Sequence, residues 1–167
     1  MNPSTNTKHA IAHASAPEVP VAYYQPIVAL ESGKIIGYEA LGRQLIDGQA
    51  VSLGPFFSNG SIPAHEHVRI DRLLREQAIA KLSRMAEPTT IFLNLKPSWI
   101  YRHYQRTGEL HTVNLLKKYG IPPGKVCIEI TEDEFNGSLS ELHEVIDLYR
   151  ASGCRIAIDD IGTGFSN

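Results

Sequence analysis

The chain has 167 residues, of which 43% are hydrophobic and 20% are charged. This composition is that of a globular domain and excludes collagen, a disulfide scaffold and a chain disordered throughout. Its 16 basic and 18 acidic residues give a formal net charge of −2. Because binding to duplex nucleic acid needs concentrated basic charge, we expect no duplex nucleic acid among its partners.

Residues 1–20 are polar and small and contain proline, so we expect a flexible N-terminal arm there rather than a signal peptide. No apolar run approaches the roughly 18 residues that cross a bilayer, so we expect no direct membrane insertion. Cys127 and Cys154 both lie in apolar, strand-like runs. We expect them to be free thiols in a reducing, cytoplasmic protein.

The first half of the chain predicts a hairpin, a loop and a helix. Residues 22–30 and 35–41 are rich in aromatic and branched residues, and the short turn between them contains Gly33, which predicts two antiparallel strands. Residues 47–64 hold several glycines and prolines and predict a long irregular loop. Residues 65–85 carry an apolar stripe at helical spacing.

The second half alternates strands and helices. Strands are predicted over 90–95, 126–131 and 155–159, and helical regions over 97–120 and 138–151. Apolar strands separated by helices indicate a parallel sheet covered by helices, as in an open doubly wound sheet or a barrel. A complete eight-stranded barrel needs roughly 250 residues. We therefore expect a fragment, or a chain completed by another copy.

Carboxylates and one amide interrupt these strands or end them. They are Glu39, Asn94, Glu129, Glu132, Asp159 and Asp160. Catalytic groups of barrels and open α/β sheets gather at the carboxyl ends of strands. A set of oxygen ligands suits Mg²⁺, Mn²⁺ or Ca²⁺ better than Zn²⁺. The adjacent Asp159 and Asp160 suit two ions, the arrangement used for in-line attack on a phosphodiester.

Each of these residues also has a plainer interpretation. Taken alone, Glu39 is explained equally well as an outward-facing strand residue. The plainer role of Asn94 is a hydrogen bond to the backbone, and that of Asp159-Asp160 is a turn or a helix cap. Their recurrence at successive strand ends favours a site. Arg43 has a guanidinium suited to a phosphate oxygen, with a surface ion pair as the alternative.

Four segments resemble, in order, the motifs of the EAL-domain family of bacterial cyclic-di-GMP phosphodiesterases. They are YYQPIVALESGKIIGYEALGR (23–43), FLNLKP (92–97), IEITEDEF (128–135) and GCRIAIDDIGTGFSN (153–167). The triplet at Glu39 carries little information alone, whereas DDIGTGFS is specific. SLGPFFSNGSIP (52–63) is similar to one subgroup. The resemblance implies that residues 21–167 are the N-terminal part of an EAL domain.

The resemblance implies a TIM-barrel-type (β/α)8 fold with an antiparallel first strand, of which this α/β chain holds about the first five strands. It implies hydrolysis of cyclic di-GMP to linear pGpG with Mg²⁺ or Mn²⁺ and one or two ions. The implied metal ligands are Glu39, Asn94, Glu129, Asp159 and Asp160, and three of them, Glu39, Asp159 and Asp160, would be catalytic.

Other positions acquire roles by the same resemblance. Arg43 would contact a substrate phosphate, Gln25 would lie beside the nucleotide, and Glu132 would anchor the glycine loop 162–167. That loop links dimerisation to the site in the family, so a homodimer is implied, and a regulatory domain outside this chain is compatible with it. The family's remaining strands bring a lysine, a glutamate and a glutamine, so we expect this chain alone to be inactive or weakly active.

Three other functions compete with a phosphodiesterase. One is a non-catalytic receptor for cyclic di-GMP. Another is a truncated EAL module for interaction or dimerisation, which would use its open edge. A metal-dependent barrel that acts on a carboxylate substrate, in the manner of enolases, is the most distant.

Overall fold

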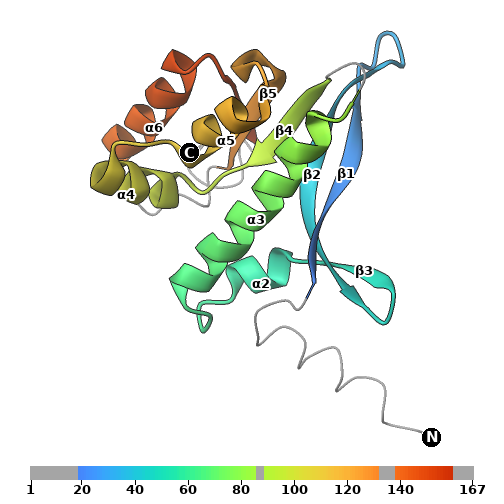
Figure 1. Ribbon diagram of the computed structural model, residues 1–167, viewed down its shortest axis with the longest axis horizontal. Helices are drawn as coiled ribbons and strands as arrows, with labels where there is room; N and C mark the ends of the chain where they lie inside the picture. The colour runs from blue at the N-terminus through green and yellow to red at the C-terminus, as the bar shows by residue number, and fades with distance from the viewer. Residues whose placement is uncertain (1–18, 86–88, 132–137, 160–167) are drawn as a thin grey trace, which may run out of the picture. The chain divides into compact units, whose positions relative to one another are not determined.

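The computed structural model describes residues 19–85, 89–131 and 138–159 (Figure 1). The strands are β1 (Pro20–Val28), β2 (Ile35–Ile46), β3 (Gln49–Ser52), β4 (Thr90–Asn94), β5 (Val126–Thr131) and β6 (Arg155–Asp159). The helices are α2 (Gly54–Ser58), α3 (Ala64–Leu82), α4 (Pro97–Thr107), α5 (His111–Tyr119), the 3₁₀ turn η1 (Pro123–Lys125) and α6 (Leu139–Ala151).

The strands form one six-stranded sheet in the order β1-β2-β4-β5-β6, with β3 paired to β2. The neighbours from β2 to β6 along this order are parallel. A short turn joins β1 to β2, in which the amide of Ala29 donates to the carbonyl of Lys34 over 2.9 Å. A connection this short requires antiparallel strands. The predicted antiparallel hairpin is therefore confirmed.

The described residues form two compact units, one made of 19–23 and 41–77 and the other of 24–40 and 78–159. The first unit has a small core in which α2 and α3 contribute apolar side chains. Its buried members are Leu53, Phe56, Ile62, Ile70 and Leu74. The second unit has the larger core, which contains the apolar side chains of β4 and β5 and of helices α4, α5 and α6.

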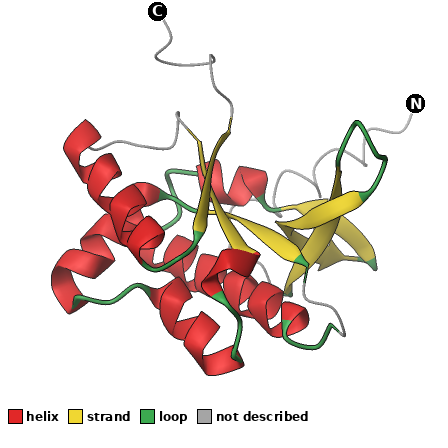
Figure 2. Cartoon of the chain, turned by 90° about the horizontal axis from the view of Figure 1, so that it is seen from above, coloured by secondary structure: helices red, strands yellow, loops and turns green. Residues whose placement is uncertain are grey.

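Alternation along β4 and β5 determines which side chains reach the larger core. Ile91 and Leu93 of β4 are 3% exposed, and Val126 and Ile128 of β5 are fully buried. Successive side chains of a strand point to opposite faces, so the residues between them face away from this core. Figure 1 shows α4, α5 and α6 grouped beside β4 and β5, and Figure 2 gives the view from above with helices in red and strands in yellow. We call the opposite face of β4 and β5, which carries Phe92, Asn94, Cys127 and Glu129, the open face.

Helix ends in this unit follow from local sequence. Ser138 begins α6 with a capping box, in which its hydroxyl accepts from the amide of Glu141 and the Glu141 carboxylate accepts from the amide of Ser138. Gly108 has φ 68° and ends α4, and Gly120 has φ 65° and ends α5. Glycine adopts this left-handed conformation without steric cost. The predicted helical region 97–120 is therefore two helices.

The prediction of an irregular loop over residues 47–64 is wrong. Asp47 and Gly48, both with positive φ, form a tight turn between β2 and β3, and this turn extends β2 to Ile46. Pro55 lies in the first turn of α2, a position that does not need the missing amide hydrogen. The glycines and prolines of this segment therefore delimit a strand and a short helix.

Candidate active site on the open face

Strand register places the predicted ligands on one face of the sheet. Glu39 of β2 lies opposite Phe92 of β4, and Asn94, two residues further along β4, lies opposite Glu129 of β5. Directly paired residues share a face, and so do residues two apart in one strand. Glu39, Asn94 and Glu129 therefore all belong to the open face, towards the carboxyl ends of parallel strands.

Glu39 and Asn94 are in direct contact. The Asn94 amide Nδ2 donates a hydrogen bond of 2.7 Å to Glu39 Oε1 across 55 residues of sequence. Glu39 is half-buried and Asn94 is exposed. A hydrogen bond to a carboxylate is stronger than one between neutral groups, so this contact fixes the orientation of Glu39. It also directs the Asn94 Oδ1 atom away from Glu39.

Glu129 is the third oxygen-bearing side chain of this face. It is half-buried, and its Oε2 atom is shielded from solvent. A buried carboxylate oxygen is costly unless a donor or a cation lies nearby. The Asn94 and Glu129 pair, together with Glu39, thus forms a set of oxygen atoms with the hard-ligand chemistry that Mg²⁺ and Mn²⁺ prefer. The donor set fits the ions that the sequence predicts.

The aromatic side chain of Phe92 lies on the same face, directly opposite Glu39 on the neighbouring strand. A Cβ atom added to Gly37 would lie 2.7 Å from the Phe92 ring and 2.7 Å from the Thr90 carbonyl oxygen. Only glycine therefore fits at residue 37 with Phe92 in this position. Glu39 follows Gly37 on the same face, so this close packing supports the strand segment that carries Glu39.

Cys127 and Arg155 are paired across β5 and β6 on the same face. Burial raises the pKa of the Cys127 thiol, the charge of Glu129 raises it further, and the charge of Arg155 lowers it. Burial also raises the pKa of Cys154 to about 11, with a smaller contribution from Cys127. Both cysteines are free and buried, as predicted. Their raised pKa values keep them protonated at neutral pH and make them poor nucleophiles.

The other predicted site residues are placed only in part. Gln25 is exposed on β1. Arg43 is half-buried on β2 in the first unit, where its side chain donates to the carbonyl of Gly42 over 2.9 Å. Asp159 ends β6, with its backbone paired to Thr131. Asp160, Glu132 and the loop 162–167 lie outside the described residues, and so does the N-terminal arm.

No group of three or more His, Cys, Asp or Glu side chains suited to a metal ion is found in 19–85, 89–131 and 138–159. The predicted set includes an asparagine, and the side chain of Asp159 and all of Asp160 fall beyond these ranges. The described part of the set therefore consists of Glu39, Asn94 and Glu129.

Arg155 and Phe92 also belong to this face, although neither was among the residues predicted for the site. The signal for Arg155 was present, because it precedes the apolar Ile156 in a strand, and alternation puts adjacent residues on opposite faces. Phe92 was hidden in an apolar run, where only the register of β4 against β2 separates the open face from the core.

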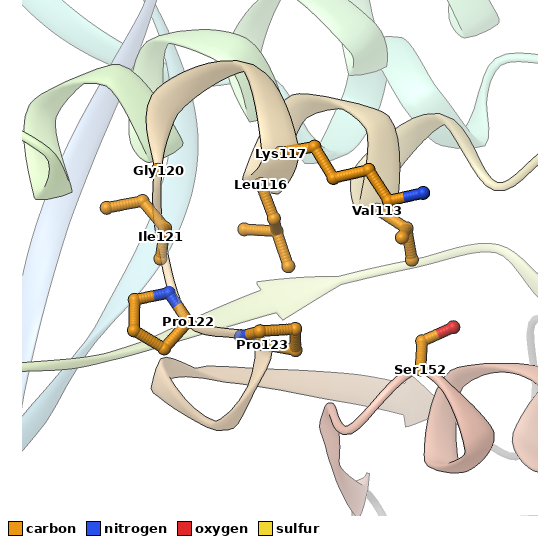
Figure 3. Close-up of a pocket in the computed structure, with 8 residues that line it drawn as sticks. All are labelled: Val113, Leu116, Lys117, Gly120, Ile121, Pro122, Pro123 and Ser152. Atoms are coloured by element: carbon orange, nitrogen blue, oxygen red, sulfur yellow. The ribbon is translucent and has the colours of Figure 1, made fainter.

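Two cavities in the described part of the second unit lie apart from Glu39, Asn94 and Glu129. One of about 530 Å³ lies between α5, the loop before β5 and the residue after α6 (Figure 3). It is lined by Val113, Leu116, Lys117, Gly120, Ile121, Pro122, Pro123 and Ser152. These connections precede β5 and β6, so the cavity lies at the amino ends of the strands. A second cavity of about 240 Å³ is lined mainly by apolar side chains, Tyr24, Tyr38 and Ile91 among them.

The family model of the EAL domain matches residues 10–167. The chain belongs to the EAL-domain family. The EAL domain chain is 36% identical over 148 residues to YkuI, an uncharacterised EAL-domain protein of Bacillus subtilis (strain 168), a match that covers 87% of the chain and 35% of YkuI. Segment 52–63 predicted the subgroup that includes YkuI, and this match agrees with it.

RocR of Pseudomonas aeruginosa, a cyclic di-GMP phosphodiesterase, is 33% identical over 153 residues, which cover 87% of the EAL domain chain and 37% of RocR. The crystal structure of YkuI with c-di-GMP and calcium matches with a TM-score of 0.77 at 31% identity, over 97% of this chain and 39% of that one. The chain thus spans little more than a third of the length of these relatives.

These matches confirm the predicted fold class, which is α/β with the parallel strands of a partial barrel. In the described sheet the barrel is not closed, because β1 and β6 are both edge strands. No helix in the described part of the chain is long and apolar enough to cross a membrane.

Proposed function

We propose that this EAL domain chain carries the first half of an active site that hydrolyses cyclic di-GMP to linear pGpG. One observation carries the proposal. Glu39 and Asn94 are hydrogen-bonded over 2.7 Å, and Asn94 is in register with Glu129, so three oxygen-bearing side chains gather on one face near the carboxyl ends of parallel strands. This is the edge at which α/β enzymes bind their substrates.

The proposed ligands of Mg²⁺ or Mn²⁺ are Glu39, Asn94, Glu129 and Asp159, with Asp160 serving a second ion. When bound, such ions polarise a phosphoryl oxygen and lower the pKa of a bound water. The contribution of the chain is to hold oxygen atoms in place. The amide of Asn94 orients the Glu39 carboxylate, and the packing of Gly37 against Phe92 supports the strand below it.

Two further residues are proposed to bind substrate. Arg43 is always charged and has a planar fork that matches two oxygens of a phosphate. Gln25 is exposed on β1 and has an amide suited to the nucleotide. Glu132 is proposed to anchor the loop 162–167. Cyclic di-GMP as the substrate class is supported by two relatives: RocR is a cyclic di-GMP phosphodiesterase, and YkuI has been crystallised with c-di-GMP.

The wider setting is also a proposal. We propose a cytoplasmic protein that forms a homodimer and that includes a regulatory domain outside this chain. We further propose that the 167-residue chain alone hydrolyses cyclic di-GMP slowly or not at all. The physical reason is that the described sheet is not closed, so one side of the site lacks the wall and the polar groups that a closed barrel supplies.

The test is an assay for pGpG by chromatography, with cyclic di-GMP and Mn²⁺, on the 167-residue chain and on the protein that contains it. We expect turnover in the whole protein and loss of turnover in its Glu39→Gln variant. Arg150→Gln, on the outer end of α6, is the control that keeps activity.

Different outcomes favour different functions. Tight cyclic di-GMP binding by the whole protein without any pGpG would favour the receptor and contradict the phosphodiesterase. Turnover by the isolated chain at ordinary enzyme rates would show that the site is completed in another way, for example by a second copy.

A further inference from the structure

The strands β4, β5 and β6 contain a single basic residue, Arg155. Ile156, its neighbour, packs against the larger core. Because side chains alternate along a strand, Arg155 belongs to the open face, the face of Glu39, Asn94 and Glu129. A strand that begins with a lone exposed arginine on an acid-bearing face needs an explanation beyond packing.

Register places Arg155 close to Glu129. Arg155 pairs with Cys127, and Glu129 follows Cys127 by two residues on the same face. Neighbouring strands lie about 4.8 Å apart and rise about 3.3 Å per residue, so the Cα atoms of Arg155 and Glu129 are about 8 Å apart, within reach of long side chains. Arg155 is thus a near neighbour of one of the proposed ligands, Glu129.

No ion pair within 4 Å joins Arg155 to any carboxylate in the described part of the chain. Its guanidinium therefore acts on the acids through space rather than as a bonded partner. A charge at this separation still counts, because the interaction of a guanidinium with a divalent ion or carboxylate falls only as the inverse of distance and is screened over about 8–10 Å.

We infer that Arg155 is the counter-charge of the acidic open face: it offsets the mutual repulsion of the carboxylates in the ion-free protein and opposes the entry of a divalent cation. This inference rests on the proposed function, because it assumes an ion at these acids. Arg155 is a positioning residue, since it is proposed to act through the charges of the neighbouring acids. It makes the face less costly to fold at the expense of cation affinity.

The experiment measures Mn²⁺ affinity by calorimetry, and thermal unfolding without added metal, for four forms of the chain. They are the wild type, Arg155→Gln, Arg155→Lys and the control Arg150→Gln, which removes the same charge from the exposed end of α6. A fifth form, Glu39→Gln, tests the metal site itself.

For Arg155→Gln we expect Mn²⁺ to bind about three- to tenfold more tightly at low salt, a gain that shrinks as sodium chloride is added. Without metal, the same variant should unfold at a lower temperature than Arg150→Gln, and Mn²⁺ should remove that difference. Arg155→Lys and Arg150→Gln should bind Mn²⁺ within about twofold of the wild type. A purely structural role would not produce tighter binding and lower stability together.

Several results would overturn the inference. If Arg155→Gln weakens Mn²⁺ binding, or if it matches Arg150→Gln in both measurements, Arg155 is not the counter-charge. If wild type and Glu39→Gln bind Mn²⁺ equally, the proposed metal site is wrong, whatever Arg155 does. If the chain binds no Mn²⁺ at all, the metal site is again wrong, and the unfolding comparison alone decides whether Arg155 stabilises the acidic face.

Discussion

The two faces of β4 and β5 differ in kind although alternate residues of the same two strands form them. On the helix-covered face, Ile91, Leu93 and Ile128 are at most 3% exposed. On the open face, one residue away in each case, lie Phe92, Asn94 and Glu129. The side chains that form the core and those of the candidate site thus alternate along the same strands.

This separation shows why a short segment such as IEIT conveys both fold and function. Its isoleucines are buried in the core, while its glutamate lies on the opposite face. Parallel strands covered by helices usually have apolar residues on both faces. A carboxylate there is a departure from that pattern, and departures of this kind mark functional positions.

The largest expected effect on stability comes from a comparison of two substitutions at adjacent residues of β5, one on each face. Ile128→Ala removes a fully buried side chain and should lower the free energy of unfolding by about 2–5 kcal/mol. Glu129→Gln, one residue on, should change it far less but should weaken Mn²⁺ binding. Urea unfolding and calorimetry measure the two quantities. Equal stability losses in both variants would abolish the distinction between the faces.

A smaller loss should follow from Gly37→Ala on the open face. Its new Cβ atom would overlap the Phe92 ring and the Thr90 carbonyl, each 2.7 Å away. We expect a cost of about 1–3 kcal/mol in urea unfolding. Gly60→Ala is the matched control, because nothing lies within 4 Å of its added atom. A double variant with Phe92→Ala should recover only part of the loss, because the backbone carbonyl remains.

The core between the sheet and its helices also contains a polar pair, formed by one residue of α5 and one of α6. The hydroxyls of Thr112 and Tyr149 lie 3.1 Å apart, and both residues are fully buried. Tyr149→Phe should cost about 1–2 kcal/mol, because it removes a buried hydrogen-bonding partner. A double-mutant cycle with Thr112→Val measures the coupling between the two groups. Additive losses would show that they do not act as a pair.

The smallest effect at neutral pH concerns Cys154. Its pKa rises from 9.0 to about 11 in the fold, mainly through burial. The folded state therefore retains the thiol proton when the unfolded state has lost it. The stabilisation is fully present below pH 9 and is lost as the pH rises through about 11. Unfolding from pH 8 to pH 11 should show this fall, and Cys154→Ala should make it smaller, with the remainder due to groups such as Cys127 whose pKa burial also raises. A stability that rises over this range would contradict the assignment.

The sequence predicted the order of the strands and helices well, because their apolar periods are long and regular. It predicted the wrong structure for 47–64, although Asp47-Gly48 between two apolar segments is a strong hairpin signal. The density of glycine and proline obscured that signal. Gly108 similarly divides a helical region that periodicity alone does not divide.

For the candidate site, sequence placed Glu39, Asn94 and Glu129 on strands but not on a common face. That step needs register, which depends on how Gly37 and Phe92 pack and on where β4 pairs with β5. The contact between Glu39 and Asn94 spans 55 residues, so no local pattern predicts it. The resemblance to the EAL family supplied roles for these residues, whereas their geometry required the fold.

The alternation along β5 has a consequence for misfolding. If β5 slipped by one residue against β4, Glu129 would turn towards the larger core and Ile128 would leave that core for the open face. Such a chain would lose its core and its proposed ligand set together. Binding of a divalent ion at the proposed site would therefore require that β5 pairs with β4 in the correct register.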